Sequence, residues 1–169
     1  MHSDAKIRDA LLRVIEVFKK RPQKALSTNR ATAVVEAGLR CSFTQGESGA
    51  VMDMPEIMGG ENAGPTPGFY ARAGIAGCVS MGIKQAAILA KLDFKKVTVD
   101  IETDFDDGAM FGLGSASAAP LVTRLAIAIE TDLPEAEVAA LVDDALRKDP
   151  WFLALKEPQA VQLDVRREG

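Results

Sequence analysis

The sequence is poor in the residues on which many active sites depend. Its 169 residues include a single histidine, His2, and two cysteines, Cys41 and Cys78. With one histidine at the very start of the chain, a histidine-based catalytic triad and a zinc site are excluded, so we expect no metal ion and no cofactor. Two cysteines 37 positions apart make no disulfide framework, which is typical of a protein of the cytoplasm.

Basic charge is also scarce. The formal net charge is −4, which argues against nucleic acid or an anionic membrane as a partner. The polar start of the chain, Met1–Asp4, predicts no cleaved leader. The longest uncharged stretch of the most apolar segment, Ala73–Ile83, is too short to span a bilayer. With 47% hydrophobic residues, the chain can bury a core, and we expect one domain over residues 1–169.

The hydrophobic pattern predicts an α+β fold with antiparallel sheets. An amphipathic helix over Lys6–Lys20, with the linker up to residue 25, forms an extra N-terminal segment. A central helix is expected over Gly68–Lys91, and a late one from Pro134 to Lys148, with Asp132 as a possible cap and a break at Asp149-Pro150. Extended segments are expected over Ala31–Thr44, Ala50–Met54, Lys96–Phe105, Leu121–Glu130 and Ala160–Arg166.

The central helix carries a stripe of very small side chains around one cysteine. At 100° per residue, Gly74, Cys78 and Gly82 fall on one face. Each interior glycine costs roughly 1 kcal/mol relative to alanine, so a helix, a partner subunit or a ligand must approach this face closely. One interpretation is tight helix packing. The other is a substrate crevice beside the thiol, formed by Gly74, Gly82 and Pro67.

This helix is apolar on nearly all sides, and only three charged residues interrupt it. Such a helix is buried on most of its surface. A chain of 169 residues with few aromatic side chains can hardly supply that cover alone. The pattern therefore predicts a homodimer.

The entry to this helix resembles that of the OsmC/Ohr family, the osmotically induced and organic-hydroperoxide-resistance proteins. The residues that carry the resemblance are Gly59-Gly60, the run Gly64-Pro65-Thr66-Pro67, and Ala76-Gly77-Cys78. The resemblance extends over the order of elements from about Ala31 to Val165. It implies an intertwined homodimer in which antiparallel sheets wrap around two central helices.

The family's chemistry is the reduction of organic hydroperoxides by a thiol, and Cys78 matches the attacking cysteine. The resemblance also implies an arginine beside the thiolate. Arg40 is the best candidate, with Arg30 as an alternative, while Arg72 points to the other side of the helix. Cys41 alternates with apolar neighbours in its strand, which favours a packing role.

Two family positions differ in this chain. The glutamate expected nine or ten residues before the cysteine is replaced by Gly68 or Phe69. The second cysteine, which resolves the oxidised thiol from a Cys-Pro pair, is replaced by Asp149 before Pro150. The usual intrasubunit disulfide therefore cannot form.

Two functions follow. The first is a hydroperoxide reductase for oxidative-stress defence that works through Cys78 alone and depends on an external thiol reductant. The second is a redox-inactive protein that binds a small apolar ligand in the dimer crevice.

Overall fold

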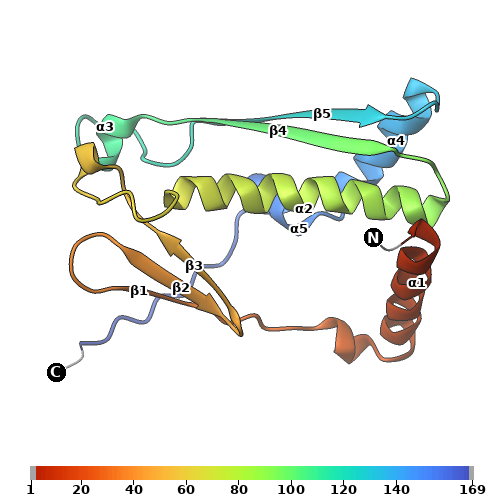
Figure 1. Cartoon of the computed structure of the whole chain (residues 1–169), viewed down its shortest axis with the longest axis horizontal. Helices are drawn as coiled ribbons and strands as arrows, with labels where there is room; N and C mark the ends of the chain where they lie inside the picture. Colours follow the sequence, from red (N-terminus) through yellow and green to blue (C-terminus); the bar gives the residue numbers. More distant parts are fainter. Residues whose placement is uncertain (1–2, 168–169) are drawn as a thin grey trace.

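The computed structural model describes residues 3–167, and His2 lies outside this range. Over residues 3–167 the chain forms five α-helices, two short 3₁₀ helices and five strands, in the order shown by the colours of Figure 1. The helices are α1 (Asp4–Lys20), η1 (Pro22–Ala25), η2 (Glu56–Met58), α2 (Pro67–Ala90), α3 (Asp107–Met110), α4 (Glu135–Leu146) and α5 (Pro150–Lys156). The strands are β1 (Thr32–Val35), β2 (Cys41–Gln45), β3 (Ser48–Met52), β4 (Lys96–Asp104) and β5 (Val122–Glu130).

The strands form two antiparallel sheets, and α2 runs between them (Figure 1). One sheet has the order β1-β2-β3, and its β2–β3 hairpin closes with Gln45 opposite Ser48. The other is the long ribbon β4-β5, which pairs Lys96 with Glu130. The predicted α+β class with antiparallel sheets is confirmed.

The core lies where α2 meets the β4-β5 ribbon and α4. Val79, Ile83 and Ala87 are buried along one face of α2, together with Phe94 and Ala145. Partly buried side chains of β4, β5 and α4 complete this cluster; they include Val97, Val99, Ile127, Ile129, Leu141 and Val142. Burial of this apolar surface fixes which face of α2 is turned inward and which remains for the site.

By length and composition alone, α2 is apolar enough to cross a membrane. The length of the uncharged stretch Ala73–Ile83 therefore does not decide whether α2 spans a membrane. However, α2 packs against β4, α4, α1 and α5 within the subunit. The central helix of a soluble protein has the same properties.

A buried aspartate organises the glycine-rich loop that leads into α2. Asp53 is only 2% exposed. Its Oδ2 accepts hydrogen bonds from the amides of Glu61 and Ala63, both at 3.0 Å, and its Oδ1 accepts one from the amide of Met54 at 2.8 Å. The bond from Ala63 is the main cause that holds the Asp53 pKa below its ordinary value.

The loop folds so closely over Asp53 that one position must be glycine. A Cβ added to Gly60 would lie 1.9 Å from the carbonyl oxygen of Met54, which no side chain can tolerate. Asp53 was not among the residues predicted from the sequence, because an isolated aspartate in a loop carries no pattern.

Several predicted elements need correction. The extended segment Ala31–Thr44 is interrupted by a turn that contains Gly38 at φ +73°, which a glycine adopts at little cost. Asp132 does not cap α4, because the helix starts at Glu135 and its N-cap position is Pro134; the Asp132 carboxylate pairs instead with Lys95 at 2.7 Å. The break at Asp149-Pro150 is followed at once by a new helix, α5. A further short helix, α3, lies between β4 and β5, where no helix was predicted.

The last predicted strand, Ala160–Arg166, is absent from the subunit. Its apolar residues Val161, Leu163 and Val165 are 76%, 88% and 92% exposed. These apolar residues do alternate along the segment, but a strand also needs a neighbouring strand whose edge can pair with its backbone N–H and C=O groups. The segment instead follows α5 toward the C-terminus without regular structure (Figure 1).

Candidate functional site

The thiol of Cys78 opens onto a groove between α2 and the α4–α5 corner. The groove encloses about 550 Å³, which lies within the range of small-molecule sites. Its lining is mainly apolar on the side of α2 and charged where α4 ends. The lining residues are Cys78, Met81, Gly82, Gln85, Ala86, Leu89, Ala90, Leu141, Asp144, Ala145, Lys148, Asp149 and Pro150.

A second buried carboxylate stands in this groove. Asp149 is 5% exposed and lies between α4 and α5. Its Oδ1 accepts hydrogen bonds from the amides of Trp151 at 3.1 Å and Phe152 at 2.8 Å, which caps α5. Pro150 takes the first helical position, where its missing N–H costs nothing. The other oxygen, Oδ2, faces α2 and would lie 3.3 Å from a Cβ added to Gly82.

Asp149 lines the same groove as Cys78 and affects its ionisation. Burial is the largest cause that raises the pKa of the Cys78 thiol above its ordinary value of 9.0, and the neighbouring carboxylate of Asp149 raises it further. The amide of Trp151 acts in the opposite direction. Burial and the charge of Asp149 therefore favour the neutral thiol of Cys78 over the thiolate at neutral pH.

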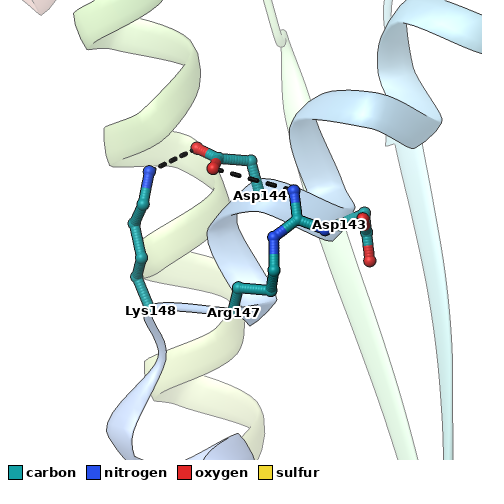
Figure 2. Close-up of polar contacts among 4 residues, drawn as sticks. All are labelled: Asp143, Asp144, Arg147 and Lys148. Carbon is teal, nitrogen blue, oxygen red and sulfur yellow. Dashed lines mark hydrogen bonds and ion pairs between the residues drawn. The ribbon is translucent and has the colours of Figure 1, made fainter.

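The charges at the rim of the groove are paired with each other. Lys148 binds Asp144 at 2.6 Å, and Arg147 reaches both Asp143 and Asp144, as Figure 2 shows. All four side chains are largely exposed, so these ion pairs add little to stability. They leave Asp149 as the charged group that acts on the thiol.

The structure brings only part of the predicted crevice to the thiol. Gly82 lines the groove next to Cys78, whereas Gly74 and Pro67 are not among its lining residues. A Cβ added to Gly74 would meet nothing within 4 Å. Within one subunit, the N-terminal half of the small-residue stripe therefore faces open space.

Arg40 lies elsewhere in the subunit. Its charge acts on Asp53, whose pKa it helps to lower, and the groups that shift the pKa of Cys78 are Asp149 and Trp151. Cys41 belongs to β2, opposite Met52 of β3, and it does not line the groove. Both cysteines are free thiols.

From the sequence, Asp149 was interpreted as a helix break and as the residue in place of a resolving cysteine, but not as a helix cap or as a charge beside Cys78. A recognisable signal was available, since Asp followed by Pro is a typical helix start, with the cap and the first helical residue side by side. Its contact with Cys78 depends on how α4 crosses α2. Within residues 3–167, no group of three or more His, Cys, Asp or Glu side chains could hold a metal ion.

A half-buried cysteine on a central helix, flanked by two antiparallel sheets, defines a class of thiol-bearing α+β proteins. The sequence model described as OsmC-like protein matches residues 59–164, which is more than half of the chain. The chain therefore belongs to the OsmC-like family. The segment with α1 lies outside the matched range.

Solved structures with this fold come from several bacteria. An OsmC-like protein from Mycoplasma pneumoniae is 15% identical with a TM-score of 0.66, and the match covers 77% of this chain and 88% of that one. An organic hydroperoxide resistance protein from Legionella pneumophila is 24% identical with a TM-score of 0.54, over 78% and 90%. A protein of the same description from Elizabethkingia anophelis is 18% identical with a TM-score of 0.54, over 78% and 89%. No curated protein matches the chain.

Proposed function

We propose that this protein is a thiol-dependent reductase of organic hydroperoxides in which Cys78 is the attacking residue. The observation that carries the proposal is the Cys78 thiol in the wall of a groove of about 550 Å³, on the central helix of an OsmC-like fold. The names of similar structures, which refer to organic hydroperoxide resistance, support the same reaction. The protein acts in the cytoplasm, where reduced thiols are abundant.

The reaction is a two-electron oxidation of sulfur. Sγ of Cys78 attacks the outer peroxide oxygen, an S–O bond forms and the O–O bond breaks. The products are a sulfenic acid on Cys78 and an alcohol. One external thiol then displaces water to give a mixed disulfide. A second external thiol releases Cys78 and leaves as the disulfide of the reductant.

An external reductant follows from the residue beside the thiol. Asp149 occupies the place in which the family has its resolving cysteine, and a carboxylate cannot form a disulfide. Cys41 lies in β2, outside the groove. Arg40 remains our candidate cation for the thiolate. Because it lies near Asp53 within the subunit, its approach to Cys78 would have to occur in an assembled dimer.

The proposed function is tested by turnover. Purified protein should consume cumene hydroperoxide when dithiothreitol is supplied, and Cys78→Ser should abolish this consumption. Cys41→Ser should keep it, because the Cys41 thiol takes no part. Equal rates for wild type and Cys78→Ser would contradict the proposal.

A second function has its own supporting observation. The raised pKa of the Cys78 thiol and the apolar lining on α2 also suit a redox-inactive protein that binds a small apolar ligand. The two functions differ in one result. A binding protein would take up an apolar ligand in the groove, while Cys78 would stay a free thiol in the presence of hydroperoxide.

We also propose a homodimer. The subunit exposes 12985 Å², whereas a compact monomer of 18.0 kDa exposes about 8,000 Å². Obligate dimers bury about 2,000–5,000 Å² in total, roughly half of it from each copy, so a second copy could cover part of the excess. The alternating residues Val161, Leu163 and Val165 are also suited to add a strand to a sheet of the second copy.

Light scattering at micromolar concentration should therefore give about twice the 18.0 kDa chain mass. The polar triple variant Val161→Ser/Leu163→Ser/Val165→Ser should weaken association, because it removes the apolar face of the added strand. A stable, well-folded wild-type monomer would contradict the dimer.

A further inference from the structure

The carboxylate of Asp149 has no counterpart in the chemistry that the resemblance implies. It stands where a resolving thiol would stand, it is 5% exposed, and it makes two distinct sets of contacts. One oxygen caps α5 through the amides of Trp151 and Phe152. The other faces α2 at the turn of Gly82, next to Cys78.

A helix cap alone does not explain this arrangement. Capping needs one acceptor oxygen, and serine or asparagine would serve equally well at this position. A buried negative charge beside a thiol hinders ionisation of that thiol. An enzyme that needs only a thiolate would gain nothing from it. The carboxylate is, however, well placed to receive the thiol proton during the reaction.

Resting on the proposed function, we propose that Asp149 is the proton relay of Cys78. It keeps the sulfur protonated at rest, accepts that proton as sulfur attacks, and passes it to the leaving oxygen. In this step the S–O bond forms and the O–O bond breaks. Sulfur loses two electrons to the peroxide, and the proton passes from Sγ through Asp149 Oδ2 to the alkoxide, which leaves as an alcohol.

The surrounding charges favour Asp149 for this role. Besides Asp149, the charged residues in the groove are Asp144 of α4 and Lys148 of the turn after α4, which are paired with each other at 2.6 Å. On α2 itself, the groove residues other than Cys78 carry no charge. Among the charged residues of the lining in the described part of the chain, Asp149 is the one whose charge acts on the thiol.

Two reactions separate a proton relay from a passive negative charge. Alkylation by iodoacetamide needs the thiolate and releases iodide, which takes no proton. Reduction of cumene hydroperoxide needs the thiolate and also releases an alkoxide, which must be protonated. Both rates are measured at pH 7 in a Cys41→Ser background, so that Cys78 is the single reacting thiol.

Asp149→Asn keeps an oxygen for the helix cap but removes the charge and the proton acceptor. Alkylation of Cys78 should become faster, by at least about threefold, because the thiolate is no longer opposed by a carboxylate. Formation of the sulfenic acid should become slower, by at least about tenfold, because general acid–base assistance is lost. If the asparagine variant folds poorly, Asp149→Ser, which also caps helices well, takes its place. Alkylation should again become faster and sulfenic acid formation slower.

Asp143→Asn is the matched control. It removes the same charge from an exposed position of α4 outside the groove lining, and neither rate should change. The relay is overturned if both rates rise in the Asp149 variants, which would make Asp149 a passive charge. It is equally overturned if neither rate changes, which would make it only a cap.

The failure of the proposed function gives a different result. Wild-type Cys78 would then be alkylated by iodoacetamide but would not react with cumene hydroperoxide. That result would contradict both the reductase and the relay. If both rates changed in parallel in an active protein, only the relay would be contradicted.

Discussion

Asp149→Cys should convert the protein into one that closes an intrasubunit disulfide. The replaced carboxylate lines the same groove as Cys78 and faces α2 at Gly82, so the introduced thiol should stand opposite the sulfenic acid as soon as it forms. One equivalent of hydroperoxide should remove two thiols per chain and release an alcohol and water. Over-oxidation of Cys78 to sulfinic acid, which we expect to occur readily in the wild type, should almost disappear.

The measurement is thiol titration and peptide mass analysis in a Cys41→Ser background. Loss of the α5 cap should cost about 0.5–2 kcal/mol, which the fold should tolerate. Asp143→Cys is the control, because it adds a thiol on α4 outside the groove lining and should close no disulfide. If Asp149→Cys still gives sulfinic acid and no disulfide, Asp149 does not stand opposite the sulfur.

Asp53→Ala should be the most destabilising single change of a charged residue. The amides of Met54, Glu61 and Ala63 would lose a buried acceptor. A buried N–H without a partner is costly, so we expect the melting temperature to fall by about 10 °C. Glu61→Ala, which removes an exposed carboxylate from the same loop, should change it little. Circular dichroism on heating measures both variants.

The pH dependence provides a second test of Asp53. Its pKa is depressed in the folded protein by hydrogen bonds to the ionised form, the bond from Ala63 first. The stability that it contributes is therefore complete above the ordinary value of 3.8 and is lost as the pH falls below it. The melting temperature of the wild type should fall more steeply in this acid range than that of Asp53→Ala. Parallel curves would show that the ionised carboxylate contributes nothing.

The elements that the sequence predicts well are those with a long, regular pattern. The ribbon strands β4 and β5 were expected within one residue of their observed ends, because Val97, Val99 and Ile101 alternate without interruption. The central helix was located by its glycine- and proline-rich entry and its apolar composition. The segments that differ depend on other parts of the molecule. Gly38 lies in a turn that the hydrophobic pattern does not reveal. Ala160–Arg166 has the alternating pattern of a strand, but the subunit offers no neighbouring strand to pair with it.

The candidate site could be predicted only in part for the same reason. Cys78 and Gly82 lie one turn apart on a single helix, so their common face follows from helical geometry. Asp149 lies 71 positions after Cys78, and only the crossing of α4 over α2 brings it to the thiol. Arg40 is similarly remote in sequence, and within the subunit it acts on Asp53 instead.

The most direct measurement is the state of Cys78 after exposure to an organic hydroperoxide. With dimedone present, mass analysis should find the sulfenic acid adduct on Cys78. The adduct should be kept in Cys41→Ser, formed more slowly in Arg40→Ala and absent from Cys78→Ser. If Cys78 remains a free thiol after the hydroperoxide treatment, while a small maleimide still labels it, the reductase is contradicted.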